Sequence, residues 1–592
     1  MSRSRLIMLF WLFAAVCGLL TLRLTQVQWI EHPRYLAQAD AQHLGQAELP
    51  ALRGEIRDRN NVVLATSIAL YSVAVNPEEA RAKLQEYKNE PDKAPEGAPT
   101  TTRELAENLA PLVNWKVDAL EDVLSRPGTF AWLARKVPDE TADAFKAKEK
   151  LLPGAWLAKE PTPGKRFYPK GSLASHLVGT TGIDDQGLDG LESAWDTYLA
   201  GEPGIIKAFM DRDGWATLGQ PAALIRPAEP GKNVILTIDE TIQYVAEREL
   251  AKQVKDYKAS GGIVIVMDAR TGEVLAMAIN PTFPAKDFGK VDPAVRRNRA
   301  ITDPYEPGST FKVFLAASAV DSGIKISDTF RAGGVLYIGG WSIHNASDGL
   351  YAGAAETLAD IIAYSFNIGT ASIAMRLGRD KFYKHLLAFG FGSKTGIDLV
   401  GESEGILSNG KDWAEINLAT ISFGQGVACT PIQLVSAMQA VANGGIRMQP
   451  RVVKAITDEQ GNVVKRFEPT ELGRPISPAA AADMVKVLRG VVEKGTGKKA
   501  QIPGYLVAGK TGTAQLVENG VYAPGKYVAS FLGFAPADDP RVVILVKIEK
   551  PTPYWGGLVA GPVFHAVGQE ALWKLGVQPD PKLLKEAENG LE

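Results

Sequence analysis

The chain has 592 residues, enough to bury at least two hydrophobic cores, and its 65 Lys and Arg residues nearly balance its 67 Asp and Glu residues. The resulting formal net charge of -2 gives no reason to expect a nucleic-acid partner. Cys17 falls inside an apolar stretch and is not expected to pair with Cys429, and the six histidines form no metal-binding pattern. We therefore expect no disulfide, no metal and no cofactor.

The first predicted element is a membrane anchor. The apolar run Leu6–Leu22 lies between basic residues and is at the short end of the ~17–25 residues that span a bilayer. Basic residues ahead of the run place residues 1–5 in the cytoplasm, so the chain after the span at 6–23 is extracytoplasmic. A cleaved signal peptide is the main alternative, but no Ala-x-Ala-like site follows the run. We favour an uncleaved, single-pass anchor.

Residues 24–230 are expected to form an extracytoplasmic pedestal domain of mixed α/β structure. Short strand-like runs at Val62–Thr66 and Tyr71–Val75 are interspersed with charged helical patches. The polar stretch Lys88–Thr102 repeats Pro, Glu, Lys and Thr, which predicts a mobile insertion. The Pro-rich segment 221–231 then signals a domain boundary.

The second domain, residues 231–576, is expected to be α+β. A strand at Asn233–Asp239 and an amphipathic helix from Glu240 open it. Further strand-like runs predict an antiparallel sheet covered by helices, at Ile263–Asp268, Val274–Ala278, Gly504–Gln515, Tyr527–Phe534 and Arg541–Glu549. The last residues, 577–592, have the composition of a polar tail.

Three short strings in this domain predict a serine acyl-transfer site: Ser309-Thr-Phe-Lys312, Ser365-Phe-Asn367 and Lys510-Thr511-Gly512-Thr513. A hydroxyl and an amine three residues apart on a helix share one face, so Lys312 can take the proton of Ser309. The Pro and Gly that precede Ser309 favour a helix start there, with apolar, helix-compatible residues at 310–320. The positive end of that helix would stabilise a developing oxyanion.

Similar strings elsewhere are interpreted differently. Ser322-Gly-Ile-Lys325 contains a glycine and is expected to be a helix end. Lys394-Thr-Gly396 follows a Gly-rich turn and is expected to be a loop. The segment Gly504–Thr511 matches the Walker A pattern, but Tyr-Leu-Val-Ala is strand material and no good helix can start after Lys510. We therefore reject a nucleotide-binding loop.

The three strings in this order resemble the signatures of the penicillin-binding protein and serine β-lactamase superfamily. Further strings resemble the class B penicillin-binding proteins in particular, and together they span residues ~50–565: Arg53–Asn60, Arg166–Pro169, Gly187–Glu192, Asp211–Gly214 and Ser422–Gly426. The resemblance implies a peptidoglycan D,D-transpeptidase that crosslinks stem peptides and is acylated by β-lactams. Elongation and division roles both remain compatible with these motifs.

The resemblance also implies a role for each site residue. Ser309 is the nucleophile, Lys312 its base, and Ser365 passes a proton to the leaving amine. Asn367 binds the substrate's amide backbone, and Lys510 lowers the pKa of Lys312. Thr511 and Thr513 bind the terminal carboxylate while Gly512 lets the substrate backbone approach, and the N–H groups of Ser309 and Thr513 form the oxyanion hole.

The expected partner is a membrane glycosyltransferase. Within residues 24–230 the string Glu121-Asp-Val-Leu-Ser125 fits the E-D-x-x-[SF] pattern found in the glycosyltransferase domain of class A relatives, but we interpret it as one face of a helix and expect no such domain here. The resemblance therefore implies a SEDS-family glycosyltransferase in the bacterial inner membrane as the polymerising partner. Two other classes stay open: a β-lactamase or β-lactam sensor, which shares the three strings, and a catalytically silent scaffold.

Two sets of residues are expected to have structural roles or remain ambiguous. Mixed charges near glycine usually organise loops, so we expect ion pairs and turn contacts from Arg53, Asp58, Arg59, Arg166 and Glu192. The string Gly424-Gln425-Gly426 either shapes a wall of the acyl pocket or makes a tight turn before a helix near Pro431.

Overall fold

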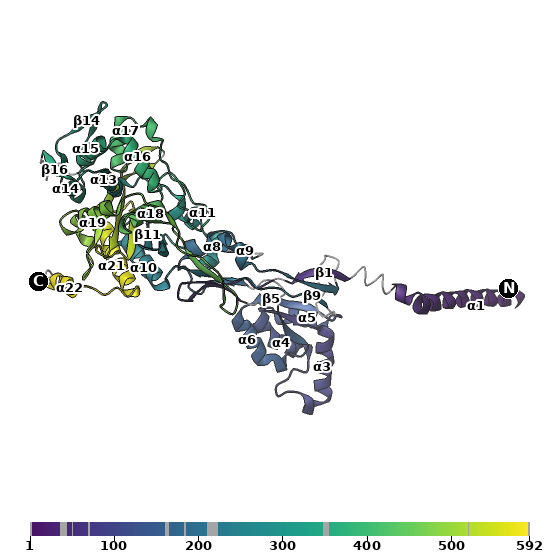
Figure 1. Ribbon diagram of the computed structural model, residues 1–592. Helices are drawn as coiled ribbons and strands as arrows, with labels where there is room; N and C mark the ends of the chain where they lie inside the picture. Colours follow the sequence, from purple (N-terminus) through teal and green to yellow (C-terminus); the bar gives the residue numbers. More distant parts are fainter. Residues whose placement is uncertain are drawn as a thin grey trace. The chain divides into compact units, whose positions relative to one another are not determined.

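The computed structural model describes residues 3–35, 44–49, 51–68, 71–159, 165–182, 185–209, 223–346, 354–518 and 520–589 (Figure 1). The chain divides into two compact units, and each is described here by itself. Unit 1 comprises Met1–Leu52, Ala69–Gly164 and Gly201–Gly231, and unit 2 comprises Arg53–Ile68, Lys165–Ala200 and Lys232–Glu592. The linear pedestal expected at 24–230 coincides with neither unit. Ile56–Arg57 pairs with Asn233–Leu236 of the second domain, and Lys165–Phe167 joins the same sheet by pairing with Val63–Ile68.

The N-terminal run forms one long helix. Helix α1 (Arg3–Thr25) is continued by a π-helical turn at Gln26–Ile30. Among the described residues, Arg3–Ile30 is the helix that is long and apolar enough to cross a membrane, judged by length and composition. The helix extends past the run Leu6–Leu22 on its C-terminal side.

Unit 1 contains a small mixed α/β layer. Strand β4 (Tyr71–Val75) lies between β5 (Ala131–Val137) and β6 (Ala155–Lys159) and pairs antiparallel with both. Helices with apolar faces share a core with this sheet: α3 (Pro77–Asn89), α4 (Thr102–Val113), α5 (Val117–Ser125) and α6 (Asp139–Lys148). A second antiparallel sheet consists of β1 (Leu44–Leu49), β8 (Gly204–Phe209) and β9 (Ala223–Arg226).

The stretch Lys88–Thr102, expected to be mobile, contains the end of α3, a 3-10 turn at Pro91–Lys93 and the N-cap of α4. Thr101 caps α4 by accepting a hydrogen bond from the Glu104 N–H. Its mobility remains a prediction.

The central sheet of unit 2 is antiparallel throughout, in the order β12-β11-β23-β22-β21. Its strands are β11 (Gly261–Asp268), β12 (Val274–Asn280), β21 (Ala508–Glu518), β22 (Val521–Ala535) and β23 (Val542–Glu549). Successive residues of β11 enter two different cores, which is the alternation of a strand buried on both faces. Val264 packs with α10 (Glu240–Asp256) and α21 (Gly561–Lys574), and Ile265 with α13 (Lys312–Asp321) and α18 (Pro431–Ala442). The predicted helix-covered antiparallel sheet is confirmed.

Strand β21 stands at the end of this order, and no other strand in the described part of the chain pairs with its outer side. It begins at Ala508, later than the sequence suggested, because Pro503–Gly504 forms a turn with φ of +81° at Gly504. Lys510 is followed by strand, so the Walker-like string has no P-loop architecture.

Other elements of unit 2 surround this sheet. Its further helices are α7 (Ser175–Val178), α8 (Gly190–Ala194), α9 (Asp196–Leu199), α11 (Pro293–Arg296), α12 (Arg299–Thr302), α14 (Leu358–Tyr364), α15 (Asn367–Leu377), α16 (Arg379–Ala388), α17 (Glu415–Ser422), α19 (Pro478–Glu493), α20 (Gly556–Val559) and α22 (Pro581–Asn589). Short strand pairs are β13 (Thr329–Arg331) with β16 (Ala355–Thr357), β14 (Leu336–Ile338) with β15 (Trp341–Ile343), and β17 (Arg447–Met448) with β20 (Glu471–Gly473).

The C-terminal segment expected as a polar tail contains helix α22. The Asp580 N–H donates to the Gly504 carbonyl oxygen at 2.8 Å, and the Tyr505 hydroxyl donates to the Val577 carbonyl oxygen at 2.7 Å. These bonds hold the chain around residue 580 to the turn that precedes β21.

A second sheet of unit 2 has the order β19-β18-β10-β2-β3-β7. It joins β2 (Ile56–Arg57), β3 (Val63–Ile68) and β7 (Lys165–Phe167) to β10 (Asn233–Leu236), β18 (Val453–Thr457) and β19 (Val463–Arg466). Next to it, the two carboxylate oxygens of Glu192 pair with Arg53 at 2.7 Å and Arg166 at 2.6 Å, and all three side chains are buried. Asp58 accepts hydrogen bonds from the N–H groups of Asn60 and Val62, which makes it a turn residue. The expected ion pairs and turn contacts are present.

Candidate active site

Ser309 lies in a 3-10 turn, Gly308–Phe311, that leads directly into α13. The sequence predicts an α-helix from residue 310, but α13 begins only at Lys312, because Gly308 has φ of +56° and the chain enters through a tighter turn. The Gly308 N–H donates to the Gly424 carbonyl oxygen at 3.1 Å. Ser309 is half-buried and lines a pocket, so its hydroxyl can be reached by a ligand.

Gly424 belongs to the string that was expected either to shape a wall of the acyl pocket or to make a tight turn. Its backbone has the positive φ of a turn. A Cβ at this position would lie 2.2 Å from the Gly308 carbonyl oxygen, and its φ is +81°. Only glycine fits both conditions. The Gly424–Gly426 turn therefore packs directly against the turn that carries Ser309.

Lys312 is fully buried, and its amine lies at the centre of a hydrogen-bond network. Nζ donates to the Ser365 carbonyl oxygen and to Asn367 Oδ1, each at 2.7 Å, and lies 3.2 Å from Ser365 Oγ. Burial lowers the pKa of Lys312 well below its usual value, and the positive charge of Lys510 lowers it further. A neutral amine has two N–H donors, which the two carbonyl oxygens occupy, so its lone pair remains available to accept a proton.

Ser365 and Asn367 lie at the junction of two helices. Ser365 ends α14 in the left-handed region, with φ of 68°, and Asn367 begins α15. A serine held in this sparsely populated conformation is strained, and such residues cluster at functional sites. The Asn367 amide spans the site, since its Oδ1 accepts from Lys312 and its Nδ2 donates to the His344 carbonyl oxygen at 2.9 Å.

Strand β21 carries the remaining predicted residues. Lys510 is fully buried, and burial lowers its pKa to about 7. Its Nζ donates to the Thr511 carbonyl oxygen at 3.1 Å. A Cβ at Gly512 would lie 2.3 Å from Ser530 Oγ and 2.9 Å from Thr310 Cγ2, so close packing inside the protein itself requires glycine there. Thr513 Oγ1 accepts from the Gly556 N–H at 3.2 Å.

A pocket of about 290 Å³ joins these elements. Of the predicted residues, Ser309, Ser365, Thr511 and Thr513 line it, while Lys312, Asn367, Lys510 and Gly512 lie behind its surface. The pocket is also lined by residues that no sequence pattern indicated: Asn345, Tyr364, Thr496, Trp555, Gly556 and Leu558. Thr496 is the most closely linked of these, because its Oγ1 lies 2.6 Å from Thr511 Oγ1. The Gly495-Thr496-Gly497 string was the one available signal for it.

The alternative strings are not part of this pocket. Ser322 caps the C-terminal end of α13, as predicted. Lys394 is exposed in a loop. The next residue, Thr395, donates hydrogen bonds from its N–H and its hydroxyl to the Glu402 carboxylate. The string Asp211–Gly214 lies outside the described residues.

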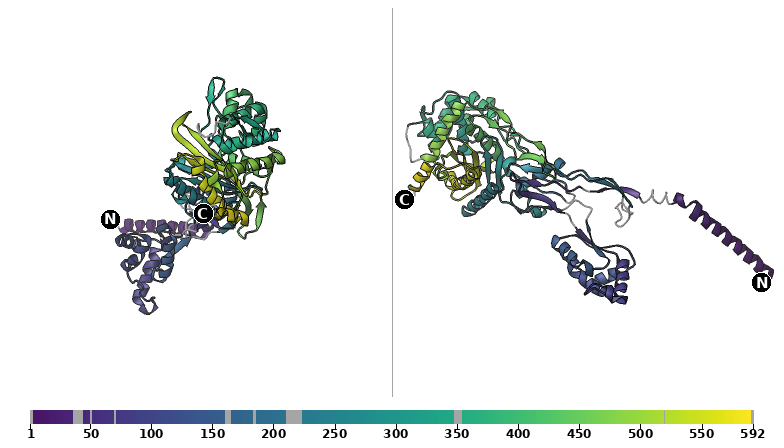
Figure 2. Two further views of the ribbon diagram at one scale, coloured as in Figure 1. Left: turned by 90° about the vertical axis from the view of Figure 1, so that its left-hand side faces the viewer. Right: turned by 60° about the horizontal axis from the view of Figure 1, so that its bottom comes forward.

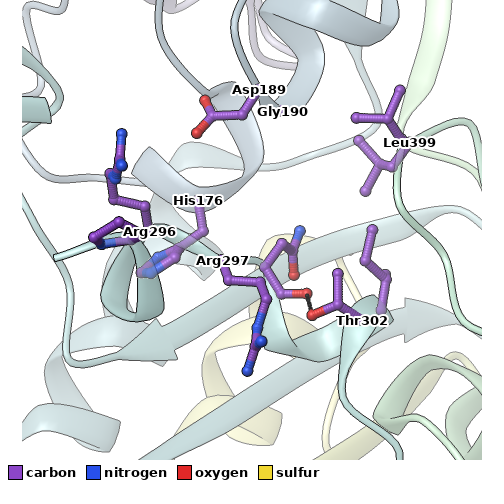
Figure 3. Close-up of a pocket in the computed structure, with 11 residues that line it drawn as sticks. His176, Asp189, Gly190, Arg296, Arg297, Thr302 and Leu399 are labelled. Atoms are coloured by element: carbon purple, nitrogen blue, oxygen red, sulfur yellow. Dashed lines mark hydrogen bonds between the residues drawn. The ribbon is translucent and has the colours of Figure 1, made fainter. Parts of the chain in front are cut away.

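A second pocket of unit 2, of about 310 Å³, shares no lining residue with the first (Figure 3). Its lining includes Asp189 and Gly190 of the Gly187–Glu192 string, His176, and the two arginines Arg296 and Arg297. His176 itself lies outside that string. Arg297 pairs with Asp303 at 2.8 Å, and burial lowers the pKa of His176 to about 4. None of the predicted catalytic residues lies here.

Comparison with known families matches both parts of the chain. Residues 262–569 match the family described as the penicillin binding protein transpeptidase domain. This range contains all eight predicted site residues. Residues 48–236 match the penicillin-binding protein dimerisation domain.

Similar proteins match nearly the whole chain. The chain is 34% identical to the stage V sporulation protein D of Bacillus subtilis, covering 98% of this chain and 86% of that protein. It is 33% identical to the probable peptidoglycan D,D-transpeptidase PenA of Neisseria gonorrhoeae, covering 98% and 94%. It is 31% identical to the peptidoglycan D,D-transpeptidase FtsI of Escherichia coli K12, covering 96% of this chain and 93% of that protein.

Solved structures agree with these relatives. Penicillin-binding protein 3 of Mycobacterium tuberculosis, in complex with aztreonam, aligns with a TM-score of 0.67 and 28% identity, covering 91% of this chain and 99% of that chain. Penicillin-binding protein 2X of Streptococcus thermophilus aligns with a TM-score of 0.77 and 26% identity, covering 90% and 81%. With a dimerisation domain followed by a transpeptidase domain, the chain belongs to the class B penicillin-binding proteins.

Proposed function

We propose that this protein is a serine-type peptidoglycan D,D-transpeptidase that crosslinks stem peptides through an acyl-enzyme on Ser309. The observation that carries the proposal is the fully buried amine of Lys312, whose pKa is held well below its usual value by burial and by the positive charge of Lys510. Burying two lysines together is costly, and such arrangements cluster at sites that need a neutral amine as a base. Relatives named as D,D-transpeptidases support the same activity.

In the first half-reaction, Ser309 Oγ attacks the carbonyl carbon of the peptide bond between two D-alanines. Lys312 accepts the hydroxyl proton as the C–O bond forms. The oxyanion is stabilised by the backbone N–H groups of Ser309 and Thr513, and the C–N bond then breaks. Ser365, which lies 3.2 Å from Lys312 Nζ, relays the proton to the departing D-alanine amine.

The outer side of β21 supports the substrate as an added strand. An extended peptide can pair with an open edge, and its main chain then supplies most of the hydrogen bonds. The terminal carboxylate binds Thr511 and Thr513, with the charged form of Lys510 behind them. We assign the substrate amide to Asn367, whose neighbour Phe366 lines the pocket.

In the second half-reaction, an amine of another stem peptide attacks the acyl-enzyme, and Ser309 regains its proton. The product is an amide bond between two stem peptides. A β-lactam that mimics the D-Ala-D-Ala terminus acylates the same serine and leaves no small amine to depart, so the ester persists.

The direct test of this function is a transfer assay with the full-length protein in detergent. A stem pentapeptide ending in D-Ala-D-Ala is incubated with an amine acceptor, and free D-alanine and the crosslinked product are quantified by mass spectrometry. We expect both products in equal amounts. Penicillin labelling without D-alanine release would indicate a β-lactam sensor, and absence of both would indicate a silent scaffold.

The acylation rate is expected to have a bell-shaped pH dependence. The rate rises with pH as Lys312 loses its proton, because only the neutral amine is a base. It falls as pH rises through about 7, because Lys510 loses the charge that attracts the ligand carboxylate. Second-order rate constants for penicillin acylation between pH 5 and 10 measure both limbs.

Lys510→Arg should remove the alkaline limb near pH 7, since a guanidinium stays charged. An alkaline limb that persists in Lys510→Arg would assign it to another group.

We further place the protein in the bacterial inner membrane as a single-pass protein whose catalytic domain is extracytoplasmic. The apolar helix Arg3–Ile30 supports this location. A SEDS-family glycosyltransferase is the proposed partner, since crosslinking needs newly made glycan strands nearby. Small residues allow close packing between membrane helices, and Ala14, Ala15 and Gly18 lie at helical spacing on α1.

Ala14→Leu with Gly18→Leu is therefore expected to weaken co-purification with that glycosyltransferase, because the larger side chains separate the two helices. Penicillin labelling of Ser309 should be unaffected. Val16→Leu with Leu20→Ile changes the opposite side of α1 and is the matched control. Normal co-purification of the Leu double variant would show that this face contacts lipid.

A further inference from the structure

The second pocket of unit 2, drawn in Figure 3, lies where two distant parts of the chain meet. Part of its lining comes from α7 and from the residue before α8, and part from α11 and the segment that follows α11. These elements lie side by side in unit 2 (Figures 1 and 2), where the His176 Nε2–H donates to the Val295 carbonyl oxygen at 2.8 Å. A volume of about 310 Å³ suits a small ligand.

Arg296 gives this pocket a cation without a partner in the described part of the chain. Its guanidinium packs on the face of the Phe288 ring, with Cζ 4.0 Å from the ring centroid. Its Nε is buried without a hydrogen bond, and among the described residues no group pairs with its terminal nitrogens. A guanidinium held by its face keeps the terminal N–H groups at its edge available, and their fork geometry matches a carboxylate.

Asp189 gives the same pocket a carboxylate with one free oxygen. Its Oδ1 accepts hydrogen bonds from the Thr180 N–H at 3.0 Å and from the Thr180 hydroxyl at 3.3 Å. No group of the described residues donates to Oδ2. Burial raises the pKa of Asp189, against the hydrogen bonds from Thr180 and the positive charge of Arg296. A cationic group of a ligand would supply the partner that the ionised carboxylate lacks.

The two charges remain apart. Arg296 is near enough to influence the pKa of Asp189, yet no ion pair joins them among the residues that the structure describes. The other charged groups of the lining are already compensated, because Arg297 pairs with Asp303 at 2.8 Å and burial lowers the pKa of His176 to about 4. The lining therefore offers one free positive and one free negative group.

Much of the remaining lining is apolar, and it includes Pro293, Ile301, Leu399 and Val400. Figure 3 shows Leu399 on the side of the pocket away from Asp189 and Arg296. A ligand that carries both charges at one end and an alkyl group at the other end would match this arrangement.

We propose that this pocket binds a small α-amino acid with an aliphatic side chain, its carboxylate on Arg296 and its ammonium group on Asp189. A simple anion would leave Asp189 unpaired beside a like charge, and a simple cation would do the same to Arg296. A zwitterion satisfies both groups. The pocket shares no lining residue with the one that contains Ser309, so the proposal does not depend on the transpeptidase function.

Calorimetric titration of the full-length protein in detergent with racemic leucine tests this proposal. The matched probes are 4-methylpentanoate, which is leucine without its amine, and 3-methylbutylamine, which is leucine without its carboxylate. We expect each of them to bind about tenfold more weakly than leucine or worse, because each loses one charge-assisted contact. Absence of leucine binding, or equal affinity for leucine and either single-charge probe, would overturn the proposal.

Two variants connect the affinity to the named residues. Asp189→Asn keeps an oxygen acceptor for Thr180, and Arg296→Met keeps an apolar chain over Phe288. Each should weaken leucine binding about tenfold or more, while Asp189→Asn should not weaken the binding of 4-methylpentanoate. Loss of both ligands in Asp189→Asn at an unchanged melting temperature would contradict the contact with the ammonium group.

Arg270→Met is the matched control, because it removes an exposed arginine that pairs with Asp539 and lines neither pocket. Its affinity for leucine should equal that of the wild type. Protein acylated by penicillin should also bind leucine with unchanged affinity. Loss of leucine binding on acylation would place the amino acid in the active-site pocket and overturn the proposal. Leucine binding without crosslinking of stem peptides would refute the proposed transpeptidase function alone.

Discussion

Ser309→Ala is expected to abolish covalent labelling by penicillin, because the proposed ester forms on the Ser309 hydroxyl. Ser309 combines a place in the pocket lining with a fully buried lysine three residues along the chain, whose pKa is well below its usual value. Intact-protein mass spectrometry after incubation with a fluorescent penicillin measures the loss. Peptide mapping of the labelled wild type should find the adduct on the peptide containing residues 308–312.

Ser322→Ala provides the control for this experiment, since Ser322 also begins a Ser-x-x-Lys string but caps the end of α13. Its labelling rate should match that of the wild type. An unchanged melting temperature for Ser309→Ala would exclude unfolding as the cause of the loss. Retained label on Ser309→Ala, or label on Ser322, would refute the assignment of the nucleophile.

Lys510→Ala is expected to slow penicillin acylation by about 10²–10³-fold, the usual effect of removing one preorganised electrostatic contact. Two causes add up. The ligand carboxylate loses its buried cation, and Lys312 loses the positive neighbour that, in addition to burial, lowers its pKa. Stopped-flow measurement of the acylation rate gives the ratio, and a circular dichroism melt checks the fold.

Lys394→Ala is the matched control for Lys510→Ala, because it removes the lysine of the other Lys-Thr-Gly string, which is exposed in a loop. We expect less than a twofold change. A larger loss of acylation rate for Lys394→Ala than for Lys510→Ala would contradict the assignment of the substrate carboxylate to the Lys510 string.

Sequence patterns predicted the central sheet and the catalytic residues because residues close together in the chain determine both. The continuous apolar, β-branched run of β11 indicates a strand, and the Pro-Gly that precedes Ser309 indicates a helical turn. The start of β21 was placed too early, since Tyr505–Val507 are strand-like residues that follow a glycine turn. Tertiary contacts with the chain around residue 580 fix that turn, and no local pattern contains them.

The remaining parts of the site depend on distant segments. Thr496 and Trp555 join the pocket from either side of β21 in sequence, and neither belongs to a string with a recognisable period. The lowered pKa of Lys312 results from burial and from a lysine nearly 200 residues away, so the string alone identifies the base but not its protonation state. Similarly, only packing revealed that Gly512 is required by Ser530 and Thr310.

The unpaired outer side of β21 has a consequence for the behaviour of the protein in solution. A row of free N–H and C=O groups attracts any extended chain, including a strand from a neighbouring molecule, and such edges are sites of aggregation. A proline or a bulge that blunted this edge would also remove the proposed pairing place of the substrate. Solubility and catalysis therefore make opposite demands on the same backbone, and a ligand that occupies the edge protects the molecule from self-association as well as from thermal unfolding.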